Sequence, residues 1–226
     1  MARSVQHDWD VSAAEAVAIQ RRLREQIRLA PLRGEIRLIA GVDTGFIDRG
    51  VTARAVIALY RYPRLELVEH AVALEPVRFP YVPGLLSFRE IPAVLKAMQG
   101  LRQRPDLLLC DGQGIAHPRR LGIATHLGLY TGIPSIGVGK SRLTGHYQEP
   151  GPEKGSQSPL LDGEERIGTV LRSRTGVRPL FVSPGHLVSH EDAVDWVLRC
   201  LTRYRLPEPI RMADRLASSR ATAAAR

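Results

Sequence analysis

The chain has 226 residues, a hydrophobic content of 44%, two cysteines and a formal net charge of +9. This length favours one domain over residues 1–226. Two cysteines exclude a disulfide scaffold and a cysteine-rich zinc site. The sequence has neither an 18-residue apolar run nor a signal-peptide core, which excludes a transmembrane helix. We therefore expect a cytoplasmic protein. The positive charge favours a polyanionic partner such as a nucleic acid.

The first third of the sequence predicts a helix followed by three antiparallel strands. Residues 13–29 have the periodicity of an amphipathic helix, with Ile19, Leu23 and Ile27 on one face. Turn signals then separate three apolar segments, which we predict as a strand meander at 35–42, 53–60 and 65–74.

The remaining sequence predicts alternating strands and helices. We expect a helix at 85–101, with Pro92 opening its second part. A strand, a helix and a strand at 106–110, 121–130 and 134–138 have the spacing of a parallel crossover. The polar segment 149–165 is predicted as a surface loop, and residues 218–226 as a frayed tail. The other predicted elements are strands at 166–171 and 179–182 and helices at 191–204 and 210–217.

A three-strand meander followed by parallel strand-helix units is the order of the α/β ribonuclease H-like fold. In that architecture the first strand and the end of the fourth strand lie side by side. Asp43 and Asp111, which follow the two apolar runs, would then converge despite their separation in the sequence.

Three carboxylates in short glycine- or aromatic-marked motifs are candidates for a metal site. They are Asp43, Glu90 and Asp111. A carboxylate at the end of a buried strand is costly unless a cation offsets its charge. Oxygen ligands favour Mg²⁺, for which Mn²⁺ could substitute, over zinc. Either aspartate alone is better explained as a turn residue, but together with Glu90 and the net charge they favour a metal-dependent nuclease. Gly45 and Gly112 would leave room for a phosphate or a sugar.

Lys140 is notable because the chain contains only two other lysines, at positions 96 and 154. A compact ammonium is present where this chain usually has arginine. The surrounding segment Gly137-Val-Gly-Lys-Ser141 also suggests a nucleotide-binding phosphate loop. That motif requires glycine six residues before the lysine, and Pro134 occupies this position, so the motif fails.

Six motifs in this order resemble the endonuclease V family across residues 35–215. They are Gly41-Val-Asp-Thr-Gly-Phe46, Pro80-Tyr-Val-Pro83, Leu86-Ser-Phe-Arg-Glu90, Asp111-Gly-Gln-Gly-Ile-Ala-His-Pro118, Gly137-Val-Gly-Lys-Ser141 and Ser183-Pro-Gly-His186. The resemblance implies a DNA repair endonuclease that nicks at the second phosphodiester bond 3′ to deoxyinosine. It also implies 5′-phosphate and 3′-hydroxyl ends, and some family members cut inosine-containing RNA.

The resemblance also assigns roles to individual residues. Asp43, Glu90, Asp111 and Asp214 would form the acidic site for Mg²⁺, and four carboxylates suit two ions. Lys140 would approach the scissile phosphate and offset charge in the transition state.

Base recognition forms a second group of implied roles. Pro80, Tyr81, Val82 and Pro83 would form a stiff wedge that enters the base stack. From spacing alone, a tyrosine ring packed on the core is the better explanation of this segment. A pocket for the flipped base would be lined by Gly84, Gly112 and Gly122. His117 would orient an acidic group or touch phosphate.

Two alternatives remain open at this point. A non-catalytic binder of inosine-containing nucleic acid could use the same pocket, although the intact carboxylates argue against it. Another ribonuclease H-like nuclease would not need a wedge that extrudes one base. The sequence does not rank DNA against RNA, because the contacts to the 2′-hydroxyl cannot be identified. We expect a monomer.

Overall fold

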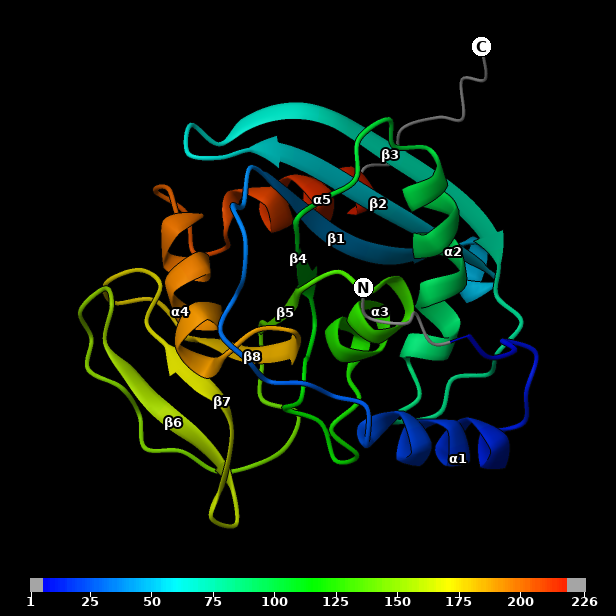
Figure 1. Ribbon diagram of the computed structural model, residues 1–226, viewed down its shortest axis with the longest axis horizontal. Helices are drawn as coiled ribbons and strands as arrows, with labels where there is room; N and C mark the ends of the chain where they lie inside the picture. Colours follow the sequence, from blue (N-terminus) through cyan, green and yellow to red (C-terminus); the bar gives the residue numbers. More distant parts are fainter. Residues whose placement is uncertain (1–5, 219–226) are drawn as a thin grey trace.

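The computed structural model describes residues 6–218, in which eight strands form one mixed sheet. The strand order is β3-β2-β1-β4-β5-β8-β7-β6 (Figure 1). Helices cover both faces of this sheet. The arrangement is the ribonuclease H-like fold, as predicted. None of the helices within residues 6–218 has the length and apolarity needed to cross a bilayer.

The predicted antiparallel meander is confirmed, but its first strand is longer than expected. It consists of β1 (Leu38–Ile47), β2 (Thr52–Arg61) and β3 (Glu66–Pro76), with the 3-10 turn Asp48–Gly50 between the first two. The prediction ended the first strand at Val42, whereas pairing with β2 continues to Ile47. Asp43 is therefore inside a strand and paired opposite Val56, because cross-strand hydrogen bonds continue past the apolar run.

The predicted parallel crossover is also confirmed. It comprises β4 (Leu107–Asp111), α3 (Ile123–Thr131) and β5 (Ser135–Gly139). Strand β4 lies between β5 and β1 and is parallel to both. The register pairs Val42 with Cys110, so the residues that follow them, Asp43 and Asp111, are neighbours across the two strands.

The sheet ends in three antiparallel strands, one of which was missed. Strand β8 (Leu180–His186) pairs with β5 and with β7 (Glu165–Leu171), which pairs with β6 (Gln157–Asp162). Segment 149–165 was predicted as a loop, which is wrong for β6. The turn after Asp162 begins with Gly163 at φ 62°, a conformation that suits a tight hairpin, and Leu160 is buried. The high polarity of the segment concealed this hairpin.

Two layers of helices enclose the sheet. Helix α2 (Ser87–Gln99) and α3 cover one face, where they pack on Ala40, Val42 and Cys110. Helix α4 (His190–Arg199) and α5 (Glu208–Ser218) cover the other, where Ile39 and Leu109 point. Helix α1 (Ala13–Arg24) packs against the start of α2 and against Leu121.

The helix bounds differ from the predictions in a few places. Helix α1 ends at Arg24 and α4 at Arg199, so both predicted helices were about one turn or more too long. Helix α2 runs unbroken through Pro92, which was expected to open a second part. Residue 218 is the last of α5, and the rest of the predicted tail, 219–226, lies outside the described residues.

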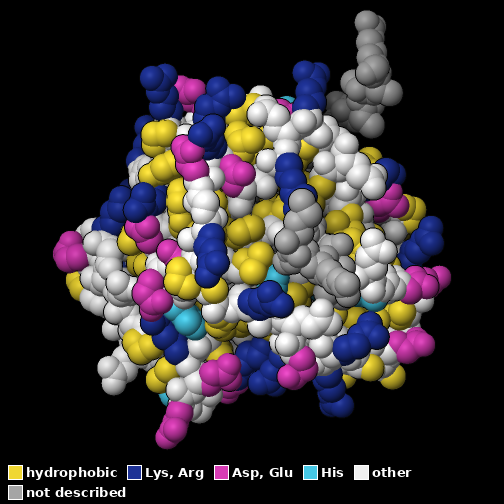
Figure 2. Space-filling view, viewed as in Figure 1, with side chains coloured by type: hydrophobic (Ala, Val, Ile, Leu, Met, Phe, Trp, Pro, Cys, Tyr) yellow, Lys and Arg dark blue, Asp and Glu magenta, His cyan; other side chains and the backbone are white. Residues whose placement is uncertain are grey.

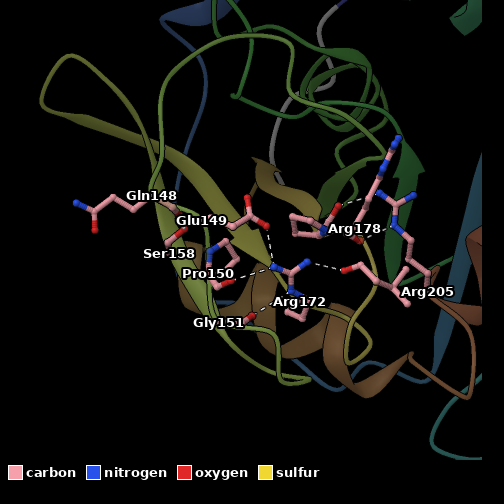
Figure 3. Close-up of polar contacts among 10 residues, drawn as sticks. Gln148, Glu149, Pro150, Gly151, Ser158, Arg172, Arg178 and Arg205 are labelled. Atoms are coloured by element: carbon pink, nitrogen blue, oxygen red, sulfur yellow. Dashed lines mark hydrogen bonds and ion pairs between the residues drawn. The ribbon is translucent and has the colours of Figure 1, made fainter.

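Buried arginines organise the loops beside β6 and β7. Figure 3 shows Arg172 donating to the carbonyl groups of Pro150 and Gly151 and to the Glu149 carboxylate. Other Lys and Arg side chains are spread over the surface, and Figure 2 shows them interspersed with acidic groups on one face. The net charge therefore does not form one continuous patch on that face.

Candidate active site

The site begins where β1 and β4 lie side by side. Asp43 lies within β1, and Asp111 is the last residue of β4. Their side chains are partly buried, which removes much of the water that would otherwise solvate two negative charges. The predicted convergence of these two residues is therefore present in the structure.

Helix α5 brings a third carboxylate to this pair. A Cβ atom at Gly41 would lie 2.1 Å from the backbone of Pro209, and one at Gly45 would lie 3.3 Å from the Ala217 carbonyl oxygen. Glycine on both sides of Asp43 thus allows α5 to approach β1 closely. Gly45 was expected to leave room for a phosphate or a sugar, which is wrong because α5 occupies that side.

The three carboxylates form a compact cluster. Asp43, Asp111 and Asp214 each offer an oxygen within 4.8 Å of the others. Burial, followed by the charge of Asp111, raises the pKa of Asp43 to about 6. Burial also raises the pKa of Asp111, although the ammonium of Lys140 opposes this effect. A divalent cation would offset the repulsion that these shifts reflect, and the all-oxygen donor set fits Mg²⁺ or Mn²⁺.

Lys140 lies directly beside the cluster. It follows Gly139, the last residue of β5, and its Nζ is 2.6 Å from Asp111 Oδ2 and 2.5 Å from Asp214 Oδ1. Its ammonium therefore neutralises part of the negative charge. The structure places the predicted lysine with two of the four predicted metal ligands.

Glu90 approaches the site from the opposite layer. It lies on α2, is 7% exposed and is outside the group of three clustered aspartates. Burial raises its pKa well above the usual range, and the charges of Asp43 and Asp111 raise it further. Glu90 therefore lies near enough to feel the charges of Asp43 and Asp111, although it comes from a different element.

A pocket of about 280 Å³ adjoins the acidic cluster. Asp111 of the cluster lines it together with Glu90, so the cluster and the pocket meet at Asp111. The three glycines predicted for the base pocket also line it, as do Tyr81, Val82 and Pro83 of the predicted wedge. Further residues that line the pocket were not predicted from their sequence motifs; they are Leu86, Ser87, Gln113, Leu121, Ile123, Ser141, Arg142 and Leu143.

The predicted wedge segment projects from the surface beside the pocket. Tyr81 is 71% exposed, so the interpretation that its ring packs on the core is wrong. The flanking Pro80 and Pro83 are exposed as well, whereas Val82 is half-buried against the cluster that contains Phe79 and Phe88. Val82 thus anchors the segment while the tyrosine ring extends into solvent.

Three side chains hold the Gly84 carbonyl, and the first of them, Gln20 Nε2, donates to it over 2.9 Å. His117 Nε2 donates to this oxygen over 3.1 Å, while its Nδ1 accepts from the backbone amide of Arg119. Arg119 Nη2 donates to the same oxygen over 2.8 Å. Burial lowers the pKa of His117 to about 4, so the ring is neutral at pH 7. His117 therefore fixes the pocket rim, whereas the sequence analysis had it orienting an acidic group or touching phosphate.

Arg205 is a functional candidate that the sequence analysis missed. Its Nη2 donates to the Lys140 carbonyl and to the Pro179 carbonyl, each over 2.8 Å, and its Nε donates to the Arg178 carbonyl. Figure 3 shows Arg205 beside Arg178. Its positive charge also opposes the rise in the pKa of Asp111 that burial causes. No motif marks Arg205 among the many arginines, and the contact joins residues 65 positions apart.

Comparisons with known proteins agree with this geometry. The family model described as endonuclease V matches residues 21–215. The chain is 63% identical to endonuclease V of Alkalilimnicola ehrlichii over 215 residues, which cover 95% of each chain.

Solved structures are similar as well. The crystal structure of endonuclease V from Streptomyces avermitilis has a TM-score of 0.88, is 42% identical and covers 95% of each chain. Endonuclease V from Ciona intestinalis, in complex with a 24-mer DNA containing an inosine followed by a ribo-adenosine, has a TM-score of 0.78 at 27% identity. That match covers 90% of this chain and 95% of the other.

Proposed function

This chain belongs to the endonuclease V family, and we propose that it is a metal-dependent endonuclease that nicks DNA at the second phosphodiester bond 3′ to deoxyinosine. The products would carry 5′-phosphate and 3′-hydroxyl ends. The observation that carries the proposal is that Asp111 belongs to the acidic cluster and also lines the pocket, beside Glu90. A base held in the pocket would position its strand beside the carboxylates.

The carboxylates would hold the metal. Asp43, Asp111 and Asp214 form the compact donor set, and Glu90 completes the acidic site from α2. When bound, Mg²⁺, or Mn²⁺ in its place, supplies a water of lowered pKa and charge stabilisation for the leaving oxygen. Lys140 Nζ would donate to a phosphate oxygen and stabilise the charge that develops on it.

The pocket and the exposed tyrosine support recognition of a single extruded base. The Tyr81 ring projects beside the pocket on a segment stiffened by Pro80 and Pro83. It would replace the stacking that neighbouring bases lose when the target leaves the helix. Gly84, Gly112 and Gly122 would bring the backbone close to the base.

The DNA in complex with the C. intestinalis relative contains an inosine, which supports the same class of ligand here. Because a ribonucleotide follows that inosine, inosine-containing RNA is a second candidate substrate. A non-catalytic inosine binder is less consistent with the site, since the carboxylates and Lys140 are all present. We also propose that the protein is a monomer and acts in the cytoplasm, where its nucleic-acid substrate would lie.

A nicking assay tests this function. Two matched duplexes that differ by one deoxyinosine are incubated with the protein in Mg²⁺ or in excess chelator. We expect one nick in the inosine duplex with Mg²⁺, at the bond immediately 3′ of the nucleotide that follows the lesion. Equal cutting of both duplexes, or cutting that persists in chelator, would contradict the proposal.

A further inference from the structure

A chain of hydrogen bonds connects the N-terminal segment to the pocket wall. His7 Nδ1 is 2.6 Å from the carbonyl oxygen of Asp8, and His7 Nε2 is 2.7 Å from His126 Nε2. His126 Nδ1 is 2.9 Å from the Oγ of Ser87. Ser87 is the first residue of α2 and lines the pocket, so this chain ends where a base would bind.

The donor and the acceptor of each hydrogen bond in this series follow from the first bond, in which the Asp8 carbonyl oxygen can only accept. A carbonyl oxygen accepts, so His7 Nδ1 carries the hydrogen. In a neutral ring Nε2 then has no hydrogen and accepts from His126 Nε2. The Nδ1 of a neutral His126 is consequently an acceptor, and the hydroxyl of Ser87 donates to it.

Packing keeps both histidine rings neutral and in place. His126 is fully buried and burial lowers its pKa well below the usual range, while burial also lowers the pKa of His7. The His7 ring centroid lies 4.3 Å from that of Trp9 and 5.6 Å from that of Phe88. The N-terminal segment is thus packed against α2 by aromatic contacts.

We infer that Ser87 is a specificity-determining residue of the pocket, whose hydroxyl oxygen, oriented by His126 and His7, accepts a hydrogen bond from the ring N1–H of hypoxanthine. This inference rests on the proposed function. The Ser87 hydroxyl donates its hydrogen to His126, so its oxygen can act only as a hydrogen-bond acceptor toward a base. Hypoxanthine carries a hydrogen at N1, whereas adenine has a lone pair there. The same contact would therefore favour the deaminated base and disfavour its parent.

Binding to three short duplexes in chelator tests the inference without any metal or cleavage step. The duplexes carry deoxyinosine, deoxynebularine or deoxyadenosine at one position, and nebularine lacks a hydrogen at N1. Ser87→Ala should reduce the ratio of inosine to nebularine affinity about five- to thirtyfold, the value of one hydrogen bond in a pocket. An unchanged ratio, or an equal loss of affinity for both duplexes, would overturn the inference.

A second variant and a control test whether His126 orients the Ser87 hydroxyl. His126→Phe keeps an aromatic ring against Phe88 but leaves the Ser87 hydroxyl free to rotate. It should lower the same affinity ratio, and Ser87→Ala should cause a smaller further loss in the double variant than it causes in the wild-type background. His186→Gln, a buried histidine outside the pocket, should leave the ratio unchanged.

Failure of this inference is distinguishable from failure of the proposed function. Suppose that the wild-type protein nicks the deoxyinosine duplex in Mg²⁺ while Ser87→Ala leaves the affinity ratio unchanged. The proposed nuclease function would then stand, and Ser87 would not be a specificity-determining residue. Wild-type protein without nicking activity would reject both.

Discussion

Lys140 Nζ lies 2.6 Å from Asp111 Oδ2; Asp111 ends β4, and Lys140 directly follows the neighbouring parallel strand β5. The ammonium is also in contact with Asp214, so one lysine offsets the charge of two carboxylates. It offsets the repulsion between these carboxylates, and in the proposed reaction it would interact with the substrate phosphate.

Lys140→Ala should therefore lower turnover about a hundred- to a thousandfold, because a donor that stabilises developing charge is lost. DNA affinity should change little, since one phosphate contact among many contributes a small share. Single-turnover nicking and binding to an inosine duplex separate the two effects. Lys140→Arg should restore little activity, because a planar guanidinium does not replace a compact ammonium. A change in affinity alone would make Lys140 a peripheral contact.

Arg205→Met should reduce kcat about tenfold or more with little change in KM, because the backbone of Lys140 loses a hydrogen bond that fixes it. Arg203→Met is a matched control, since Arg203 is an exposed arginine of the same loop whose hydrogen bond is to its neighbour Tyr204. Steady-state nicking kinetics of both variants provide the measurement. Equal effects from the two substitutions would assign the loss to loop stability or net charge.

Tyr81→Ala should weaken recognition of a duplex inosine about ten- to a hundredfold, from the loss of roughly 1–3 kcal/mol of stacking. Tyr81→Phe should have little effect, since the ring supplies the stacking. The loss should shrink on a single-stranded inosine substrate, where no neighbouring stack must be held apart. Because the Tyr81 side chain is largely exposed, the melting temperature of the Tyr81→Ala protein should stay near the wild-type value. Equal losses on single and double strands would reject the wedge.

His186 provides a test of pH dependence away from the pocket. Burial lowers the pKa of His186 to about 4, whereas the unfolded chain titrates near 6.5. Between these values the unfolded state binds more protons, so the free energy of unfolding falls as pH decreases. The slope from this histidine is at most about 1.4 kcal/mol per pH unit.

His186→Gln should reduce the difference in the free energy of unfolding between pH 7 and pH 5, measured by urea denaturation. His70→Gln, a substitution on the exposed edge strand β3, is the control and should leave that difference unchanged. A difference as large in His186→Gln as in wild type would show that other groups account for the pH dependence.

The sequence predicted the fold because its apolar runs and turn residues are local signals. Ile39 and Leu109 lie in apolar runs that mark two strands, and the parallel pairing of these strands was expected from the ribonuclease H-like order of elements. The end of β1 was not predictable from hydrophobicity, because pairing with β2 continues through Asp43 and Thr44. The β6 hairpin was missed for a similar reason, since its polar strand is held by pairing with β7.

The site was predictable where a motif surrounds each residue. Motifs identified Asp43 and Asp111, and β1 and β4 bring them together as expected. The approach of Asp214 depends on glycines in β1 that allow close packing of α5, a tertiary effect that spacing alone does not reveal. The exposure of Tyr81 and the contact of Arg205 with Lys140 likewise required the three-dimensional structure.

The most direct measurement for the central claim is divalent-metal binding by Asp43→Asn beside wild type, followed by nicking of the deoxyinosine duplex at saturating Mg²⁺. The substitution is nearly isosteric and removes one anionic oxygen from the compact cluster. We expect weaker Mn²⁺ binding by calorimetry, loss of nicking and an unchanged fold by circular dichroism. Wild-type metal affinity together with wild-type nicking in Asp43→Asn would contradict the assignment of the cluster as the metal site.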